Sequence, residues 1–303
     1  MIQMALSPRA WALLLALSLI WGSSFLTTTE LLDVMAPLHV VTHRVLWAAV
    51  LLWGYVLLRR FPLPRDARTL GALFLMGLGN NAVPFALQAF AQTTIESGLA
   101  GILNATTAIF GPLVAAIFLA DERLRPGRAA GVALGFAGIV VVIGPAALSG
   151  IDPRSLAQLA MLASTLSYAL SSVWARRHLG HLRPEVAALG MLTASALTLL
   201  PLSWLVSGPL PLALPGPTLA AIGYYAGVVT ALAYLIYYQL IRTAGAGNTM
   251  LVTLLIVPVA VSLGAVVRAE ALPLSAYAGF GLIALGLILI EGRLLRRRAP
   301  GRV

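Results

Sequence analysis

The 303-residue sequence has no cysteine and no lysine. Without cysteine there are no disulfides, thiolate nucleophiles or Cys-ligated metals. Without lysine there is no Walker-type phosphate loop, which excludes direct ATP hydrolysis. Neither Gly-x-Ser-x-Gly nor His-Glu-x-x-His occurs, and the four histidines lack metal-ligand spacing. We therefore predict no catalytic residues, no metal site, no cofactor and no enzyme activity.

Charged residues are also scarce. They make up 10% of the chain, whereas hydrophobic residues make up 60%; soluble domains carry about 25% and about 45–50%. The mean hydropathy is +0.93. A water-soluble fold cannot hide so much apolar surface, so the surrounding solvent must be a lipid bilayer. The composition predicts an all-α integral membrane protein.

Ten apolar segments are long enough to cross a membrane as helices. They cover about residues 10–29, 36–58, 69–91, 97–119, 127–147, 155–175, 185–207, 217–240, 244–267 and 274–293. Arg9 precedes the first segment as in a signal peptide, but no small-residue cleavage site follows it. We expect ten transmembrane helices, the first of them retained in the protein.

All twenty basic residues are arginine, and together with ten acidic residues they give a net charge of +10. If the N-terminus is inside, seventeen arginines fall in inside segments, two in outside loops, and Arg44 within a span. The positive-inside rule then predicts that both termini are cytoplasmic. We expect a multi-pass protein of a bacterial inner membrane. Because the arginines form no stripe, we expect no nucleic-acid partner.

Five landmarks recur in the same order at an offset near 147 residues, as in 184 − 37 = 147. They pair Trp21–Ser24 with Tyr168–Ser171, Pro37 with Pro184, Pro112 with Pro258, Glu122 with Glu270, and Gly138 with Gly286. This spacing indicates two repeats, residues 1–147 and 148–303, within one membrane domain. Five spans are an odd number, so we expect inverted-topology repeats, as in many secondary transporters. The alternative is an old duplication in a protein that does not transport.

Short motifs cover nearly the whole chain. They are Leu19–Phe25, Pro37 followed by Arg44, Pro112 with Phe118–Leu124, Gly131 with Gly138–Val141, and Thr230–Tyr234 through Gly245 and Ala246 to Pro258. Together they resemble the EamA family of the drug/metabolite transporter superfamily. The resemblance implies a ten-helix transporter, usually an exporter of small metabolites, and YddG-like amino-acid exporters are one candidate identity. In the second half, the counterpart of the acidic motif at Phe118–Leu124 is Val267–Glu270. It keeps the acidic residue but has a different turn, which leaves the role of this end of the span open.

Polar groups inside a bilayer are costly, so they usually face the interior of a helical bundle. We predict a central cavity lined by the first, third, fourth, sixth, eighth and ninth spans. Its candidate substrate-binding residues are Trp21, Ser24, Asn81, Gln88, Asn104, Tyr168 and Tyr234. The alternative for the serines is interhelical hydrogen bonding, and for the tyrosines a place in the aromatic belt.

The fifth and tenth spans are almost purely apolar and rich in glycine, including Gly131, Gly135 and Gly138. Small residues allow close helix packing. We expect these two spans to be peripheral supports, and a subunit interface there is left open. Pro84, Pro112 and Pro258 are either hinges for alternating access or fixed bends.

His43 and Arg44 form the only ionisable pair well inside a span. For Arg44 we favour a structural role over binding of a substrate carboxylate. No Asp or Glu lies near the middle of any span, although a buried carboxylate is the commonest proton carrier. This favours facilitated or exchange transport, with His43 the only titrating alternative near neutral pH. Glu122 and Glu270 end their spans, where we expect screened contacts with loop arginines.

These features predict a secondary transporter that exports small zwitterionic or amphipathic metabolites, most plausibly amino acids. A carrier of cationic drugs would be expected to display a central carboxylate, and a nucleotide-sugar carrier more central basic residues. The other classes are an integral-membrane enzyme, for which no convergent acid/base set is visible, and a scaffold without transport.

Overall fold

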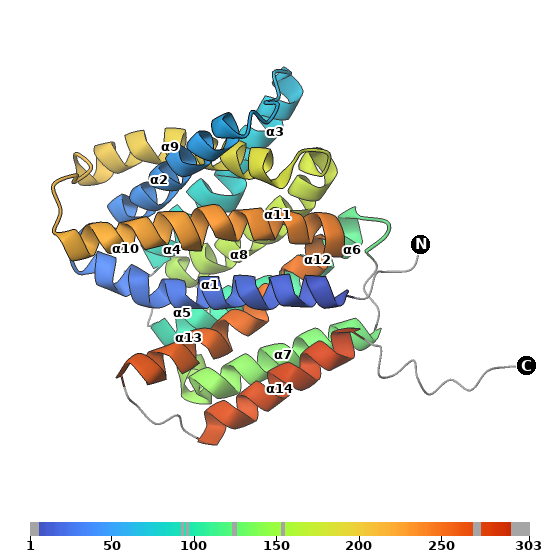
Figure 1. Cartoon of the computed structure of the whole chain (residues 1–303). Coiled ribbons are helices and arrows are strands. Elements are labelled where there is room, and N and C mark those ends of the chain that lie inside the picture. Colours follow the sequence, from blue (N-terminus) through green and yellow to red (C-terminus); the bar gives the residue numbers. More distant parts are fainter. Residues whose placement is uncertain are drawn as a thin grey trace, which may run out of the picture.

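A computed structural model describes residues 6–91, 94, 97–122, 126–152, 155–268 and 274–291. Within these ranges all regular secondary structure is helical, and the helices form one bundle (Figure 1). The prediction of an all-α protein is therefore confirmed for the described part of the chain. Glu270 and the arginines from position 293 onward lie outside it.

The first half contains seven α-helices. They are α1 (Pro8–Leu32), α2 (Pro37–Leu58), α3 (Ala67–Gly77) with η1 (Leu78–Ala82) and α4 (Val83–Ala91), α5 (Ser97–Ala105) with α6 (Thr107–Phe118), and α7 (Pro126–Ile143). A short 3-10 helix, η2 (Pro145–Gly150), leads to the second half. α7 ends earlier than predicted because Gly144 has a φ of 109° and Pro145 cannot continue the helix.

The second half has a matching order of elements. They are α8 (Leu156–Trp174) with η3 (Ala175–Leu179), α9 (Pro184–Ser207), α10 (Gly216–Ala226) with η4 (Gly227–Leu232) and α11 (Ala233–Ala244), α12 (Ala246–Thr249) with α13 (Val252–Arg268), and α14 (Leu274–Glu291). α11 runs past the predicted end near 240, up to Gly245, whose φ of 91° is readily adopted only by glycine.

The helix starts follow local sequence signals. Proline occupies the first turn of α2 and of α9, where its missing N–H leaves no bond unmade. At the start of α3, the Asp66 carboxylate accepts a hydrogen bond from the backbone N–H of Thr69 at 2.8 Å. That bond stabilises the charged form and lowers the pKa of Asp66 below its usual value.

Within the described ranges, eight stretches of helix are long and apolar enough to cross a membrane. They are Pro37–Leu58, Ala67–Gln88, Gly101–Phe118, Pro126–Ile143, Leu156–Leu179, Pro184–Ser207, Gly216–Ala244 and Ala246–Leu263. Large apolar side chains on these helices point outward, including Leu58, Ile117 and Leu205, which are 75–84% exposed. Such surfaces need lipid around them. α1 and the shorter apolar α14 occupy the two remaining predicted segments, and the count of ten spans stays a prediction.

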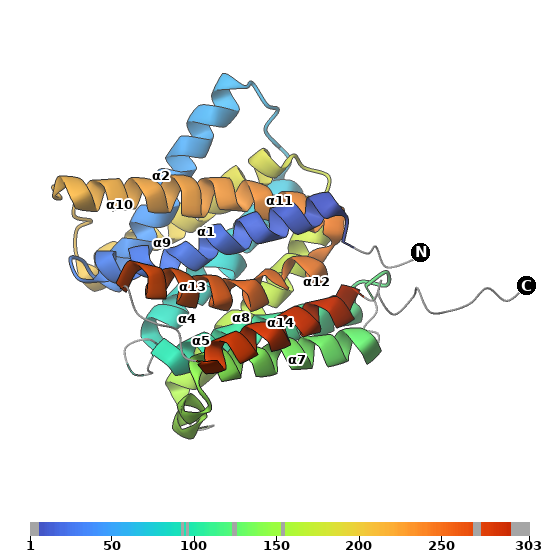
Figure 2. The same cartoon turned by 60° about the horizontal axis from the view of Figure 1, so that its bottom comes forward.

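The helices of the two halves interleave. α2 packs on α9, α1 on α13, α4 and α6 on α8, and α3 on α9. α7 and α14 pack chiefly on each other, and both views place this pair at the edge of the bundle (Figures 1 and 2). The start of α1 and the end of α14 lie at the same end of the bundle, which we call the terminal end (Figure 1).

η1 and η4 are π-helical turns inside two long helices. Pro84 lies two residues after the end of η1 and cannot donate to the carbonyl of Asn80, which explains the irregular turn there. η4 contains no proline, and nothing in its sequence explains it. Side chains bond the backbone carbonyls of both turns: Ser167 donates to Gly79 at 2.6 Å, and Trp21 donates to Val229 at 3.2 Å. Irregular backbone inside a membrane needs such partners.

Candidate substrate cavity

A cavity of about 140 Å³ lies between the two halves. Its lining combines amides, hydroxyls, aromatic rings and one guanidinium. The lining residues are Trp21, Ser24, Arg44, Asn80, Phe85, Gln88, Asn104, Thr107, Tyr168, Tyr234, Tyr237, Met250, Val252, Thr253 and Ile256. All six spans that the sequence singled out contribute to this lining, and α2 adds Arg44. Of the described residues that line the cavity, none comes from α7 or α14.

The structure brings six of the seven predicted site residues together around this cavity. Asn81 is the exception. Its side chain is fully buried behind the wall, where it donates to Ser195 Oγ at 2.8 Å and accepts from the Tyr234 hydroxyl. The neighbouring Asn80 lines the cavity instead. That any of these residues binds substrate stays a prediction.

The cavity amides are partly bonded to one another. Gln88 Nε2 lies 3.3 Å from Asn104 Oδ1 and 3.3 Å from Ser164 Oγ. Asn80 Nδ2 donates to the Tyr234 hydroxyl at 3.3 Å. Gln88 Nε2 therefore uses both of its N–H donors, and Asn80 Nδ2 also contacts Asn81 Oδ1 at 3.5 Å and Met191 Sδ at 3.6 Å. The capacity left for a ligand lies in the N–H groups of Asn104 and in the carbonyl oxygens of Asn80 and Gln88. The network fixes the orientation of the amides.

Aromatic side chains form a second part of the wall. The ring of Trp21 lies 6.1 Å from that of Tyr234 and 6.0 Å from that of Tyr237 between centroids. Tyr237 is 1% exposed, and its hydroxyl has no hydrogen-bond partner among the described residues. A buried hydroxyl without a partner is costly and is uncommon in native structures. The sequence pointed to Tyr234 on this helix and missed Tyr237.

Arg44 reaches the cavity from α2. Its Nε donates to Thr230 Oγ1 at 2.9 Å and its NH1 to the Tyr225 hydroxyl at 3.3 Å. The guanidinium carbon lies 4.9 Å from the centre of the Phe85 ring and 4.8 Å from that of Tyr225. These neighbours fix the guanidinium in place inside the bundle, so it does not reach outward to the membrane surface.

His43, next to Arg44, does not line the cavity. Trp47 Nε1 donates to its Nδ1 at 3.0 Å, so Nε2 carries the proton and donates to the Pro211 carbonyl at 3.0 Å. Both ring nitrogens are therefore engaged, and protonation of Nδ1 would break the bond from Trp47. This arrangement disfavours the alternative in which His43 titrates during transport.

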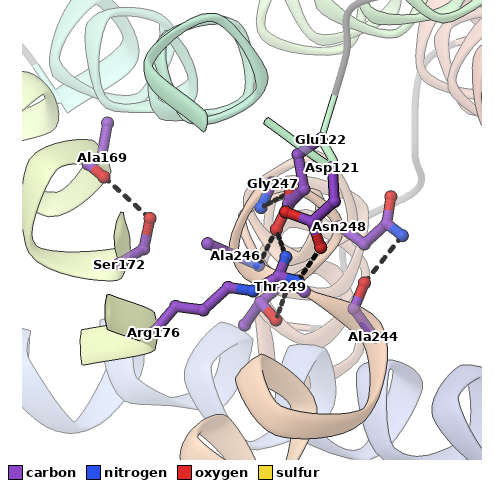
Figure 3. Close-up of polar contacts among 11 residues, drawn as sticks. Asp121, Glu122, Ala169, Ser172, Arg176, Ala244, Ala246, Gly247, Asn248 and Thr249 are labelled. Atoms are coloured by element: carbon purple, nitrogen blue, oxygen red, sulfur yellow. Dashed lines mark hydrogen bonds and ion pairs between the residues drawn. The ribbon is translucent and has the colours of Figure 1, made fainter. Parts of the chain in front are cut away.

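At the terminal end, Glu122 joins the end of α6 to the start of α12 (Figure 3). Its two carboxylate oxygens accept the backbone N–H groups of Ala246 and Gly247, each at 2.8 Å. Arg176, in η3, forms ion pairs with Glu122 and Asp121. The predicted contact of Glu122 with an arginine of an inside segment is therefore present. Glu122 is only 5% exposed, so the prediction that this contact is screened is wrong. Sequence reasoning missed the unpaired N–H groups at a helix start, which stabilise a carboxylate.

Long apolar helices around a small polar cavity define a class of protein, the polytopic membrane transporters. The sequence model of the EamA-like transporter family matches residues 9–144 and 155–292. The chain belongs to this family, and hence to the drug/metabolite transporter superfamily that its motifs resemble. Membership indicates a transporter that acts on a small molecule in a lipid bilayer, rather than an enzyme.

The chain is similar to the uncharacterized inner membrane transporter YedA of Escherichia coli K12, with 28% identity over 282 residues, covering 91% of this chain and 89% of YedA. An uncharacterized transporter of Archaeoglobus fulgidus is 24% identical over 285 residues, covering 93% and 98%. A solved crystal structure matches with a TM-score of 0.79 at 21% identity, covering 96% of this chain and 99% of that one. This last likeness shows the fold alone.

Proposed function

We propose that this protein is a secondary transporter that exports small polar or amphipathic metabolites, foremost amino acids, across a bacterial inner membrane. The observation that carries the proposal is the cavity, because side chains from both halves line it. A volume of about 140 Å³ is below the range of about 300–1,000 Å³ typical of drug-sized sites. A known cavity of about 150 Å³ accommodates benzene, so the size favours an amino acid over a drug or a nucleotide sugar.

The chemistry of the wall suits a zwitterion. The carbonyl oxygens of Asn80 and Gln88 can accept from an ammonium, and the N–H donors of Asn104 can bind a carboxylate. The rings of Trp21 and Tyr168 line the same space and supply aromatic faces for the ammonium. A cation–π contact contributes about 0.5–2 kcal/mol. Substrate binding by Trp21, Ser24, Gln88, Asn104, Tyr168 and Tyr234 is part of this proposal.

The transport mechanism that we propose is alternating access between two inverted five-helix repeats, residues 1–147 and 148–303. Packing of α7 on α14 supports it. A methyl group on Gly131 would lie 2.5 Å from the Gly286 carbonyl, and one on Gly138 would lie 2.7 Å from that of Gly279. A shift of 148 residues relates Gly131 to Gly279 and Gly138 to Gly286, since 279 − 131 = 148 and 286 − 138 = 148. The same shift therefore converts the Gly131–Gly286 pair into the Gly138–Gly279 pair. The two helices run antiparallel, as a two-fold axis in the membrane plane requires.

Other packing follows the same exchange. α1 packs on α13 and α11, just as α8 packs on α6 and α4. The π-helical turns η1 and η4 begin at Leu78 and Gly227, close to the same offset. The family model also matches one stretch in each half. These correspondences favour ten spans and a repeat over a single irregular bundle.

Orientation and location complete the proposal. The arginine distribution favours cytoplasmic termini, and the Escherichia coli relative is named as an inner membrane transporter. Without lysine the chain has no Walker loop, so we assign the driving force to solute gradients or exchange.

Proteoliposomes preloaded with amino acids test the proposal by counterflow of labelled amino acids, with protein-free vesicles as the control. We expect uptake of at least one amino acid above the control. No flux of any amino acid would refute the substrate assignment. Chemical conversion of substrate without flux would favour an integral-membrane enzyme.

A further inference from the structure

Arg44 carries a charge that nothing around it neutralises. A guanidinium has five N–H donors, and the two bonds that it makes go to the neutral hydroxyls of Thr230 and Tyr225. Among the described residues no carboxylate lies within ion-pair distance of Arg44. It is also the only charged residue among the described residues that line the cavity.

An uncompensated charge at this depth needs a reason. Ionisable groups within membrane helices are costly, and they usually pair with another group or mark a substrate pathway. The rings of Phe85 and Tyr225 lie within 5 Å of the guanidinium and stabilise it by cation–π interaction. They hold its plane in position but leave its net charge unchanged. A planar guanidinium fixed in this way is suited to bidentate binding of a carboxylate.

A second group on the same wall is also without a partner. Tyr237 lines the cavity, and its buried hydroxyl makes no hydrogen bond among the described residues. Asn104, which is bonded to Gln88 through its Oδ1, adds the N–H donors of its Nδ2 to the wall. The cavity therefore presents one cation and several donors, and no anionic group from the described residues that line it. An ammonium group finds no countercharge in it.

We infer that Arg44 binds a carboxylate of the cargo, so that substrates are small carboxylic acids, with or without an amino group. The inference rests on the proposed transport function and narrows its substrate class. The carboxylate is the required group, and the ammonium of an amino acid is dispensable. Cationic amines and neutral amides are excluded, because they leave the Arg44 charge unpaired or repel it.

Thermal melting of the full chain in detergent tests the inference without depending on flux. The probes are the proteinogenic amino acids and a matched set on one carbon skeleton: valine, 3-methylbutanoate, valinamide and isobutylamine. All are used at millimolar concentration and constant ionic strength. We expect melting to rise with valine or another amino acid and with 3-methylbutanoate, and to stay unchanged with the amide and the amine.

Two variants of Arg44 and one control connect this response to the guanidinium. Arg44→Gln should weaken carboxylate binding about 10- to 100-fold, as expected for loss of a charge-assisted bond. Arg44→Lys keeps the positive charge and is the variant to use if Arg44→Gln does not fold. It should weaken carboxylate binding about tenfold, because the planar bidentate guanidinium is lost. Arg242→Gln, at an exposed position on α11, should respond as the unaltered protein does.

The outcomes separate the two proposals. If folded Arg44→Gln or Arg44→Lys binds carboxylates as tightly as the unaltered protein, the inference is wrong. It is also wrong if the amine or the amide stabilises as well as the acid, or if no carboxylate stabilises at all. Flux of a neutral or cationic solute in proteoliposomes would then leave the transporter proposal standing. Carboxylate binding without flux would support the site and overturn the transport function.

Discussion

Tyr237 packs against Trp21 in the cavity wall, with 6.0 Å between ring centroids, and its buried hydroxyl has no partner among the described residues. Tyr237→Phe removes a group that makes no bond within the protein. We therefore expect unchanged or slightly higher melting stability, together with about a threefold to tenfold loss of substrate affinity. Tyr238→Phe is the control, since its hydroxyl contacts Met191 Sδ at 3.3 Å and lies outside the cavity. Equal effects of the two variants on transport would contradict the assignment.

Asn104 and Asn81 should respond differently to the same substitution. Asn104 lines the cavity, so Asn104→Ala should reduce substrate binding by about 1–3 kcal/mol if a ligand loses its partner, with little change in melting. Asn81 bonds Ser195 and Tyr234 inside the protein. Asn81→Ala should therefore lower the melting temperature, because it leaves buried groups unpaired. Counterflow and melting curves measured on both variants decide the matter, and loss of flux confined to Asn81→Ala would place the site elsewhere.

Glu122 should contribute far more to stability than its neighbour Asp121. Glu122→Gln replaces a buried acceptor of two backbone N–H groups with an amide that has a single acceptor oxygen. We expect a loss of about 1–3 kcal/mol, as for hydrogen bonds to a charged group. The Asp121 side chain is 45% exposed, so Asp121→Asn should cost about 0–1 kcal/mol. Thermal and denaturant unfolding in detergent compare the two, and equal losses would remove the special role of Glu122.

Close packing of α7 on α14 predicts a sharp contrast between two glycines. Gly138→Ala would place a methyl group 2.7 Å from the Gly279 carbonyl and 2.9 Å from the Ile283 backbone nitrogen, which forces the helices apart. A loss of about 1–3 kcal/mol is expected for such overpacking. A methyl group on Gly281, on the same α14, meets nothing within 4 Å. Gly281→Ala should be neutral or stabilise by up to about 1 kcal/mol. Unfolding of both variants measures the difference, and tolerance of Gly138→Ala would argue against this packing.

Reporter fusions test the proposed topology. Fusions at Gly150 and Leu210 should report a location outside the cytoplasm. Fusions at Pro64 and Gly180 should report a cytoplasmic location. The reason is the concentration of arginine in the loops assigned to the inside. Activity of paired alkaline phosphatase and fluorescent-protein reporters provides the measurement. The reverse pattern at any two of these sites would overturn the orientation.

The helical segments were predictable because their signals are local. Apolar runs of membrane length and helix-starting prolines such as Pro37 and Pro184 need no tertiary information. The π-helical turns were not predictable in the same way. η1 shifts the facing of the residues around it, so a periodicity of 100° per residue grouped Asn81 with Gln88 as cavity residues. In the structure Asn80 lines the cavity and Asn81 does not.

The amides and aromatics of the cavity were accessible to sequence reasoning, because such groups within a bilayer require partners. Arg44 was harder to interpret. Its position depends on Thr230 and Tyr225, which lie more than 180 residues away in the sequence. No local sequence signal distinguishes a guanidinium that reaches the membrane surface from one that lines a cavity. Among the described residues the Tyr237 hydroxyl has no hydrogen-bond partner. This too depends on the packed structure and has no signal in the sequence.

Arg44 also breaks the equivalence of the two halves. At the repeat offset its counterpart is Met191, since 191 − 44 = 147, and the Met191 thioether accepts from Asn80 at 3.6 Å instead of facing an anion. Two equivalent halves alone would make a carrier that works equally in both directions. With one fixed guanidinium, the empty cavity carries a net positive charge, and membrane voltage acts on this charge with up to about 2.3 kcal/mol per charge for 100 mV. When a bound carboxylate neutralises the guanidinium, the voltage no longer acts on a net charge in the cavity. The protein would then behave as an electrical rectifier, in which the return of the unloaded carrier is the voltage-sensitive step.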